Sequence, residues 1–582
     1  MATIFERRNG QVIYRSPNNL KVPNLDLLTF LLDNPENADR LNDDTVLHAD
    51  AADPSRCITK GRLVSLVERL AHTLSTKFSI KAGDVVQVVF TGHYLAPAVF
   101  YAILATGAAV AACTPSAPPQ EMARQMRLTE SKLLISSPDL RPLAAAGGSQ
   151  AGLPDSHILY MGDNDNLSLF EAKSNKEVPL SSERRPWRRI TSPEELANTT
   201  ACLIYSSGTT GVPKAVKISH ANMVAQAYLI LTPLREYYAK HDPNFHHRTV
   251  AHLPAAHISG LQGYFVNLTY MGGITYWMPK FDFAKFLEYN KRLKLTMFFS
   301  VPPIFLAIAK SPLVTDQFDT LGFAHTGAAA LGGDIQAQAQ AKLGKGKAPL
   351  GQTWGLSETT GGFTTLPRHL SDDTGSVSMI VANCEARIVD EKGRDVEPGQ
   401  VGEMLVRGPI VTKGYFKNEK ANQEAFVDGW FCTGDNLYFK DGKFYYVDRK
   451  KELIKYKGFQ VAPAELEALL VTNPKIQDAA VIGIESDNKD GNELPRYVDP
   501  RMTLFIGREC ICEANKCSAY VVADKSQVSG KEIADWVASQ VAPYKQLRGG
   551  VHFIDVIPKS PAGKILRKDL RALAARMKGP KL

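Results

Sequence analysis

The segment Tyr-Ser-Ser-Gly-Thr-Thr-Gly-Val-Pro-Lys, at residues 205–214, follows an apolar run at residues 201–204. Such a run predicts a buried strand, and we expect the strand to deliver a loop that approaches a ligand closely. Gly208 and Gly211 lack a Cβ and tolerate positive φ, so successive backbone N–H groups can converge on an anion. Hydroxyl donors and one compact cation complete a set suited to phosphate oxygens: Ser206, Ser207, Thr209, Thr210 and Lys214.

A surface turn is the alternative interpretation, because Ser, Thr and Gly are common in turns. Four hydroxyls, two glycines and a lysine within ten residues favour phosphate binding. The spacing differs from the G-x-x-x-x-G-K-[ST] motif of P-loop NTPases, since Lys214 lies three residues after Gly211 and neither Ser nor Thr follows it. The segment therefore predicts a phosphate loop of another kind.

Five further motifs follow this loop along the chain. They are Gly355-Leu356-Ser357-Glu358, Thr433-Gly434-Asp435, Asp448-Arg449, Lys-Tyr-Lys-Gly-Phe-Gln at 455–460 and Pro-Lys-Ser-Pro-Ala-Gly-Lys at 558–564. With these motifs, in this order, the chain resembles the adenylate-forming (AMP-binding) superfamily, and within it the 4-coumarate- and fatty-acyl-CoA ligases. The resemblance spans nearly the whole chain. It implies a two-step reaction in which a carboxylate attacks the α-phosphate of ATP and the thiol of CoA then displaces AMP.

Length and composition agree with a globular protein of more than one domain. A chain of 582 residues exceeds one ordinary core, and 44% hydrophobic with 22% charged residues are ordinary values. The net charge of +8 suits ATP, CoA and a small carboxylic acid as partners and does not by itself indicate nucleic acid. Eight scattered cysteines fit a reducing compartment, and the N-terminus lacks the pattern of a signal peptide.

One uncharged run, residues 94–113, is long enough to suggest a membrane span. Pro97, Gly107 and the alanines of the run instead predict a buried helix that breaks at Gly107 and continues as a strand. We therefore expect a soluble protein without a membrane span.

The pattern of the whole chain predicts an α/β fold. Apolar runs such as 85–90, 132–136 and 297–301 alternate with helical patterns, which favours α/β layers with largely parallel sheets. After Gly375, short strands and turns predict a small β-rich, barrel-like subdomain, and a new helix from Pro463 opens a compact α+β domain. The resemblance places the N-terminal domain at 1–448, a hinge at 449–451 with Lys451 at the hinge position, and a mobile C-terminal domain at 452–582.

The resemblance also implies a nucleotide site. Glu358 matches the residue that holds Mg²⁺, a hard cation that prefers oxygen ligands. Asp435 matches the carboxylate that accepts the ribose hydroxyls, and Arg449 is its usual companion. Trp354 replaces a more frequent Tyr and keeps an aromatic wall for adenine. The remaining ATP- and AMP-binding candidates are Gln352, Gly355 and Ser357.

Lys564 is the first candidate for the catalytic cation. A Pro/Ser/Gly-rich loop can carry it into a site on the facing domain, where it would bridge the attacking carboxylate and the AMP oxygens. His257 matches a histidine near the acyl carboxylate. The chain lacks the Phe-Asp pair of peptide-synthetase adenylation domains there, which argues against an amino-acid substrate. A surface lysine and a structural histidine are the alternatives. Lys455 and Gln460 match residues that contact the acyl-adenylate.

Acyl and CoA sites follow from the same resemblance. Ser259 is small where coumarate ligases often have Tyr, which predicts a roomier acyl tunnel. The acyl-pocket candidates are His257, Ser259, Gly327 and Ala328. The CoA-binding candidates are Lys457 and Gly458, and more weakly Lys280.

Residues 497–518 depart from the superfamily pattern, because they separate segments that are adjacent in relatives. Their three cysteines fit zinc poorly without a nearby histidine: Cys510, Cys512 and Cys517. Codons for 496–498, 514–515 and 517–518 can contain GTATGT, GCTAAC and TGCAG, the donor, branch and acceptor signals of a short fungal-type intron. We therefore expect a retained intron in a fungal gene. A mature transcript that dominantly encodes 497–518 would contradict this, and we would then expect a loop.

Two further expectations concern subcellular localisation and activity. The ending Pro580-Lys581-Leu582 resembles the Ser-Lys-Leu peroxisomal signal, so we expect peroxisomal import, with the cytosol as the alternative. The leading function is an ATP- and Mg²⁺-dependent carboxylic acid:CoA ligase, with a role in fungal secondary metabolism among the possibilities. A luciferase-like enzyme, a stand-alone enzyme that hands acyl-AMP to a carrier protein, and a non-catalytic nucleotide or acyl binder are the alternatives.

Overall fold

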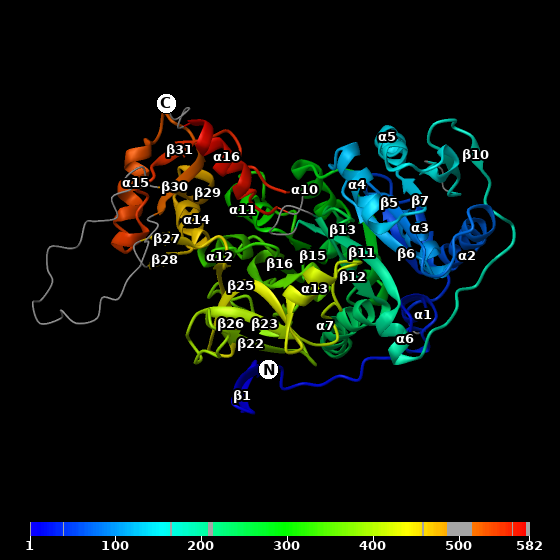
Figure 1. Cartoon of the computed structure of the whole chain (residues 1–582), viewed down its shortest axis with the longest axis horizontal. Coiled ribbons are helices and arrows are strands. Elements are labelled where there is room, and N and C mark those ends of the chain that lie inside the picture. The colour runs from blue at the N-terminus through cyan, green and yellow to red at the C-terminus, as the bar shows by residue number, and fades with distance from the viewer. Residues whose placement is uncertain are drawn as a thin grey trace, which may run out of the picture.

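The computed structural model describes residues 2–38, 40–162, 166–207, 213–456, 459–485, 515–560 and 563–577. An eight-stranded sheet forms the first layer of the large lobe (Figure 1). Its strands, in spatial order, are β10 (Glu177–Val178), β9 (Leu169–Glu171), β8 (Ile158–Met161), β7 (Leu133–Ser136), β5 (Val85–Val89), β6 (Ala109–Cys113), β11 (Thr200–Ser207) and β12 (Pro213–Ser219).

The centre of this sheet is parallel and its edges are antiparallel. Strands β8, β7, β5, β6 and β11 run parallel, whereas β9, β10 and β12 pair antiparallel. Every residue of β5 and β6 is buried, as expected for strands covered on both faces. The predicted α/β fold is confirmed, with mixed edges that the sequence pattern did not indicate.

The uncharged run forms the predicted helix and strand. Helix α3 (Ala96–Ala105) is buried at every position, Gly107 has a φ of 85°, and β6 follows directly. A left-handed φ suits glycine, which has no Cβ to clash. Among the described residues, no helix is both long and apolar enough to cross a membrane.

Two smaller sheets continue the large lobe. A four-stranded sheet has the order β13 (Arg248–Ala251), β14 (Ile274–Trp277), β3 (Val46–Asp50) and β4 (Cys57–Thr59), and a parallel three-stranded sheet has the order β15 (Met297–Ser300), β16 (Phe323–Thr326) and β17 (Leu350–Gln352). The helices packed around them include α7 (His220–His241), α8 (Ile258–Gly260), the π-helix η4 (Leu261–Asn267), α9 (Leu268–Tyr270), α11 (Pro302–Lys310) and α12 (Gly333–Gln340).

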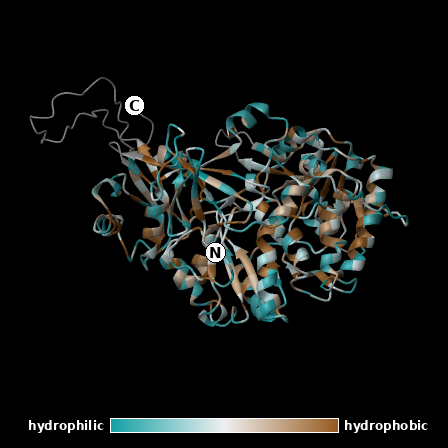
Figure 2. Cartoon of the chain, turned by 90° about the horizontal axis from the view of Figure 1, so that it is seen from below, coloured by the Kyte–Doolittle hydropathy of each residue, from teal (hydrophilic) through white to brown (hydrophobic). Residues whose placement is uncertain are grey.

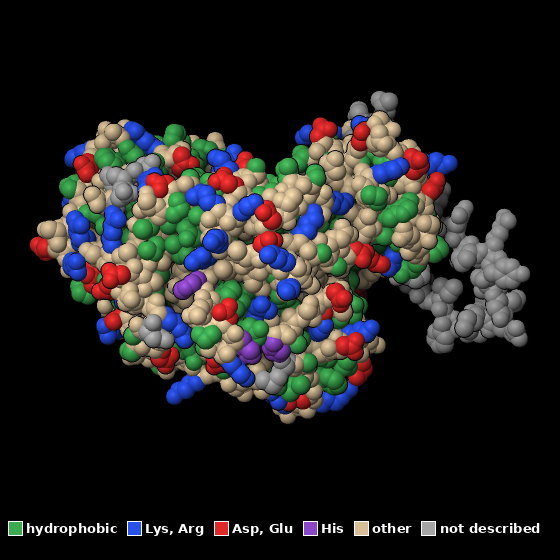
Figure 3. Space-filling view, turned by 180° about the vertical axis from the view of Figure 1, so that it is seen from behind, with side chains coloured by type: hydrophobic (Ala, Val, Ile, Leu, Met, Phe, Trp, Pro, Cys, Tyr) green, Lys and Arg blue, Asp and Glu red, His purple; other side chains and the backbone are tan. Residues whose placement is uncertain are grey.

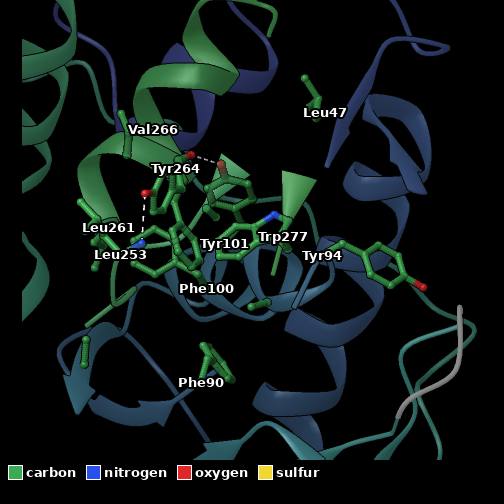
Figure 4. Packing of buried hydrophobic residues seen from close by; sticks show 14 of the residues in the cluster. Leu47, Phe90, Tyr94, Phe100, Tyr101, Leu253, Leu261, Tyr264, Val266 and Trp277 are labelled. Carbon is green, nitrogen blue, oxygen red and sulfur yellow. Dashed lines mark hydrogen bonds between the residues drawn. The ribbon is translucent and has the colours of Figure 1, made fainter. Parts of the chain in front are cut away.

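Aromatic side chains join α3 to the π-helix and to β14 (Figure 4). The rings of Phe100 and Trp277 each lie 5.2 Å from the ring of Phe265 in edge-to-face contact. The Tyr101 hydroxyl donates to the carbonyl of Phe265, and the Tyr264 hydroxyl accepts the backbone N–H of Leu253 at 3.2 Å. This core fixes the π-helix against the large lobe.

The predicted β-rich region is a seven-stranded antiparallel sheet. Its strands are β1 (Ile4–Arg8), β2 (Gln11–Arg15), β22 (Glu385–Val389), β23 (Gly402–Arg407), β24 (Phe426–Val427), β25 (Trp430–Lys440) and β26 (Lys443–Arg449). The N-terminal hairpin β1–β2 was not predicted. Its signal is Asn9-Gly10, because both residues have positive φ, 53° and 78°, as a two-residue type I′ turn requires.

The C-terminal part forms a separate lobe with its own hydrophobic core (Figure 1). It contains β27 (Ile454–Tyr456), β28 (Phe459–Val461), β29 (Ile476–Glu485), β30 (Asn515–Ala523), β31 (Val551–Phe553), α14 (Pro463–Thr472), α15 (Gly530–Ala538) and α16 (Arg567–Met577). The helix expected from Pro463 is confirmed. The division into domains at 448 and 452 stays a prediction.

Most of the unusual segment 497–518 lies outside the described residues. Its last four residues, 515–518, belong to β30 and pair antiparallel with residues 482–485. Cys517 is 2% exposed in the core of the C-terminal lobe. The expectation of a loop is therefore wrong for these four residues, because they continue a strand whose partner is already in place.

The two lobes are in close contact. A Cβ built on Gly332 would lie 3.2 Å from the Cβ of Ala468, and a Cβ on Gly563 would lie 3.0 Å from Val301. The Lys310 ammonium donates to the carbonyl of Ile476. Figure 2 shows apolar residues gathered inside the lobes, and Figure 3 shows charged side chains of both signs near the junction.

Candidate functional site

A cavity of about 2320 Å³ lies between the lobes and extends into the large one. Most small-molecule pockets measure roughly 300–1,000 Å³, so this cavity has room for more than one ligand. Predicted residues from both lobes line it: Ser206, Lys214, His257, Ser259, Ala328, Gly355, Ser357, Glu358, Asp435, Arg449, Lys451 and Lys564.

Both ends of the predicted phosphate loop, residues 205–214, belong to strands. Strand β11 continues through Ser207, and β12 begins at Pro213, so Ser206 and Lys214 face each other as an antiparallel pair. Lys214 is thus a strand residue and not a loop residue. Its ammonium lies 4.8 Å from the centre of the Tyr415 ring. The loop residues Gly208, Thr209, Thr210 and Gly211 lie outside the described residues, as do Lys457 and Gly458.

Glu358 lies in the short 3-10 helix η6 (Ser357–Thr359) and points into the cavity beside Tyr415. The Tyr415 hydroxyl donates to Glu358 Oε1 at 3.0 Å. Burial raises the pKa of the Glu358 carboxyl, and the hydrogen bond from Tyr415 opposes this. Sequence reasoning missed Tyr415. This tyrosine is far along the chain from Glu358 and Lys214, and no local motif marks it.

Asp435, the carboxylate predicted to bind the ribose, is buried and held by two neighbours. Asp435 is 4% exposed, and its carboxylate lies 3.6 Å from Arg449 Nε. The indole N–H of Trp354 donates to Asp435 Oδ2 at 2.9 Å. Burial raises the pKa of Asp435, while Arg449 and the Trp354 hydrogen bond lower it. Arg449 and Trp354 therefore fix the carboxylate from two sides.

Trp354 has contacts that differ from those predicted. Its ring is 5% exposed and meets Phe363 edge-on at 5.8 Å. It is not among the described residues that line the cavity, so it orients Asp435 in this structure. Gln352 is likewise 3% exposed, and its amide donates to Leu331 O and Gln336 Oε1 at 2.8 Å each. The nucleotide contacts predicted for these two residues stay predictions.

His257 caps the N-terminus of α8 at the cavity wall. Its Nδ1 accepts the Ser259 backbone N–H at 3.3 Å and lies 2.8 Å from Ser259 Oγ. With Nδ1 as the acceptor, the neutral ring has its proton on Nε2. Burial, with the nearby Lys564 charge, lowers the pKa of His257 to about 4. Ser259 therefore sets the histidine tautomer, a role that the sequence did not reveal.

Lys564 reaches the cavity from the C-terminal lobe. Ser560 holds its loop, because Ser560 N donates to Lys564 O at 2.8 Å and Ser560 Oγ accepts Lys564 N–H at 3.2 Å. Gly563 has a φ of 77° and touches Val301 of the large lobe. A side chain at Gly563 would be both strained and obstructed, so glycine permits this approach.

Burial and neighbouring charged groups shift the pKa of Lys564. Burial, and then Arg449, lower the pKa of Lys564 to about 8, while Asp435 and Glu452 oppose the shift. The Lys564 charge in turn lowers the pKa values of His257 and Asp435. The cavity thus brings one cation of the C-terminal lobe close to two predicted residues of the large lobe.

Two of the acyl-pocket candidates, Gly327 and Ala328, lie at the carboxyl end of β16. Gly327 follows the strand, and a Cβ there would lie 2.9 Å from Thr353. Ala328 lines the cavity with a φ of 70°, which is strained for a residue with a Cβ. Such strain is often found at ligand sites.

Two other predicted residues are not placed on the wall of the cavity. Lys280 and Gln460 are exposed and are not among the described residues that line it. The Gln460 amide donates to Glu391 at 3.4 Å, and Lys455 pairs with Gln460 across β27 and β28. Lys451 does line the cavity and lies between β26 and β27, within the turn from Arg449 to Glu452. The proposed roles of these four residues stay predictions.

Comparison of the sequence with known proteins identifies relatives over its whole length. A protein of Emericella nidulans with the provisional name acyl-coenzyme A synthetase is 40% identical over 576 residues, which are 97% of this chain and 99% of that protein. The phenylacetyl-CoA ligase epaB of Aspergillus niger is 31% identical over 568 residues, covering 96% of this chain and 98% of that protein.

Solved structures share the fold. The ATP-bound MatB of Rhodopseudomonas palustris matches with a TM-score of 0.77 at 22% identity, covering 95% of this chain and 99% of that one. The o-succinylbenzoate coenzyme A synthetase of Bacillus subtilis, solved with ATP and a magnesium ion, matches with a TM-score of 0.72 at 22% identity, covering 93% and 99%. Residues 35–416 match the family described as AMP-binding enzyme. The chain therefore belongs to the AMP-binding enzyme family.

Proposed function

We propose that this chain is an AMP-forming carboxylic acid:CoA ligase. The observation that supports this most is the meeting of Lys564, from the C-terminal lobe, with His257 and Asp435, from the large lobe, in one cavity. The names of the relatives agree with this activity. The sequence reasoning and the geometry therefore point to the same reaction.

In the first step, the acid carboxylate attacks the α-phosphate of ATP and pyrophosphate leaves. Negative charge accumulates on the phosphate oxygens, and a fixed cation in a water-poor site stabilises it. Lys564 supplies that cation, and the Nε2–H of His257 donates to the acid carboxylate. Asp435, held by Trp354 and Arg449, binds the ribose hydroxyls and fixes the nucleotide.

The residues present fit a magnesium ion that arrives with ATP. Mg²⁺ usually takes one or two protein carboxylates together with substrate phosphates. Glu358 offers one carboxylate on the cavity wall near Lys214. Within the described residues, no three His, Cys, Asp or Glu side chains group to hold a metal alone. Bound there, the ion would neutralise phosphate charge in the first step.

In the second step, the thiolate of CoA attacks the acyl carbon and AMP leaves. Lys564 would then no longer be needed, and the C-terminal lobe would rotate about Lys451 to admit CoA. Lys457 and Gly458 would line the CoA channel in that arrangement, and Lys280 would contact its phosphates. Movements of whole domains commonly separate the steps of such reactions.

A panel of carboxylic acids with ATP, Mg²⁺ and CoA tests the proposal. We expect the mass of an acyl-CoA thioester to appear with at least one acid, with AMP and pyrophosphate formed in equal amounts. A carrier-dependent or oxygen-dependent product in place of a thioester would favour the stand-alone or luciferase-like alternatives. Nucleotide binding without turnover of any acid would contradict the proposal.

Replacing Tyr415 by phenylalanine should selectively weaken the binding of magnesium at the site. The change removes the hydroxyl that orients Glu358 and keeps the ring that contacts Lys214. Loss of one hydrogen bond to a charged group corresponds to about 1.5–3 kcal/mol, so we expect the Mg²⁺ concentration for half-maximal adenylation to rise by roughly 10- to 100-fold.

The control is Tyr415→Leu, which removes hydroxyl and ring together. It should also raise the KM for ATP, because Lys214 loses its aromatic contact. Mg²⁺-dependent binding of ATP, followed by calorimetry without acid, gives a readout independent of turnover. A Mg²⁺ dependence in Tyr415→Phe equal to that of the wild type would rule out the orienting role.

Adenylation should fall as pH rises through about 8. The pKa of Lys564 is lowered to about 8 by burial and by Arg449, so its cation is present below this pH and is lost above it. The reaction needs the cation, so kcat/KM for ATP should decline on the alkaline side. Acid-dependent ATP–pyrophosphate exchange, measured between about pH 6 and 10, follows this alkaline decline in kcat/KM. Lys564→Arg, whose guanidinium stays protonated over this whole pH range, should not show this decline.

We also propose peroxisomal import through Pro580-Lys581-Leu582, which lie outside the described residues. The support is the resemblance of this ending to a Ser-Lys-Leu signal. A fluorescent reporter followed by the last ten residues should enter peroxisomes, and removal of Leu582 should return it to the cytosol. A diffuse signal with and without Leu582 would contradict the proposal.

A further inference from the structure

The cavity extends well beyond the residues that meet the nucleotide. One of its walls is a face of the three-stranded sheet. Phe299, His325 and Gly351 are register neighbours on β15, β16 and β17, and all three line the cavity. Two residues earlier, Met297, Phe323 and Pro349 line it as well. Residues two apart on a strand share a face, so the cavity runs down the sheet from its carboxyl end.

Helix α7 forms a second wall that runs along the strands. Six of its cavity-lining residues recur at intervals of three and four, as expected for one face of a helix: Gln226, Leu229, Ile230, Pro233, Leu234 and Tyr237. Leu231 and Glu236, beside this stripe, line the cavity as well. The two ends of this stripe can be placed. Gln226 donates to Gly362 O at 2.9 Å, and Gly362 lies against Thr353 at the carboxyl end of the sheet. Tyr238 lies 6.2 Å from Phe323 near the opposite end.

Two independent lengths follow from these walls. Pro349 and Thr353 flank β17 and are four residues apart on the extended chain, or about 13 Å. From Gln226 to Tyr237 there are eleven helical residues, or about 16 Å. Lys564 and His257 mark the reactive end, since Gly563 touches Val301 directly after β15. The cavity is thus a tunnel that leads away from the reactive end.

Resting on the proposed ligase function, we infer that the acid substrate has an elongated, mainly apolar chain that lies between α7 and the three-stranded sheet. An extended chain advances about 1.2 Å per bond, because one residue of three bonds spans roughly 3.5 Å. A tunnel of 13–16 Å therefore holds roughly a dozen carbons. Compact aryl acids and short acids would leave most of it unfilled.

Gly263 is the position that keeps the tunnel open. It lies on the π-helix η4, six residues after His257, and lines the cavity. A Cβ built on Gly263 meets no atom within 4 Å, so a larger side chain would enter free space. π-Helices are uncommon and often occur at functional sites. A bulky residue at this point would close the tunnel beyond the first part of the chain.

The experiment compares the wild type with Gly263→Phe, which should block the tunnel. Gly263→Ala is the control for the effect of replacing glycine in the π-helix. Met297→Trp should block the tunnel from the wall formed by the sheet. Saturated acids of four to sixteen carbons serve as substrates. Each buried methylene contributes about 0.8 kcal/mol, so kcat/KM for the wild type should rise about tenfold for every two carbons until the tunnel is filled. Gly263→Phe should lose at least about 100-fold with the twelve-carbon acid and little with the four-carbon acid.

A binding measurement separates this inference from the proposed function. Hydrolysis-resistant acyl-sulfamoyl adenosines with four- and twelve-carbon chains need no turnover. We expect the wild type and Gly263→Ala to bind the long analogue more tightly, and Gly263→Phe and Met297→Trp to lose that preference. Equal affinity of the wild type for both analogues, or an unchanged preference in both blocked variants, would overturn the inference. Failure of the ligase proposal would instead appear as absence of thioester despite tight binding of the long analogue.

Discussion

Replacing Lys564 by alanine is expected to reduce adenylation by about 100- to 1,000-fold, the usual effect of removing one fixed charge-stabilising group. Thioester formation from supplied acyl-adenylate should stay close to the wild-type rate. The reason is that Lys564 neutralises charge which develops only while pyrophosphate leaves. Acid-dependent ATP–pyrophosphate exchange measures the first step, and rapid mixing of acyl-adenylate with CoA measures the second.

Lys559→Ala is the matched control for this result. Lys559 lies on the same loop and lines the same cavity, yet its ammonium pairs with Asp478 of its own lobe at 2.6 Å. Its loss should leave ATP–pyrophosphate exchange nearly intact. Equal damage to both half-reactions by Lys564→Ala would show that Lys564 supports the fold of the loop and not the chemistry.

Replacing Lys451 by proline should have the opposite effect to Lys564→Ala: it should slow thioester formation and spare adenylation. Proline fixes φ near −65° and removes a backbone N–H, so it restricts the turn that joins β26 to the C-terminal lobe. The lobes already meet in the arrangement that places Lys564 in the cavity, and adenylation should therefore persist. Thioester formation, which requires rotation of the lobe, should fall by at least about tenfold.

Lys451→Ala is the control for the hinge, because it removes the side chain and leaves the backbone torsions free. Its two half-reactions should change together and only slightly. If Lys451→Pro slows adenylation as much as thioester formation, the hinge does not lie at this residue.

Much of the fold follows from local patterns in the sequence. The run at 94–113 becomes α3, a left-handed Gly107 and β6, since apolar periodicity and one glycine decide these elements within a few residues. The hairpin β1–β2 is different. Its turn residues are local, but its strand partner is β22, where Tyr14 pairs with Ala386, and only tertiary pairing determines that neighbour.

The candidate site divides in the same way. Motif residues such as Glu358, Asp435 and Lys564 could be named from the sequence because each lies in a characteristic segment. Their supporting contacts could not, because Tyr415 and Trp354 act on carboxylates that are distant along the chain. The wall of the tunnel could not be predicted either, since the free space at Gly263 is a property of the folded structure.

Transfer of an oxygen label tests the central claim most directly. An acid that is turned over is supplied with ¹⁸O in its carboxylate, together with ATP, Mg²⁺ and CoA, and the AMP is analysed by mass. If the carboxylate attacks the α-phosphate, one labelled oxygen remains on AMP after CoA has taken the acyl group. Label in inorganic phosphate with formation of ADP, or AMP without label, would contradict an acyl-adenylate intermediate.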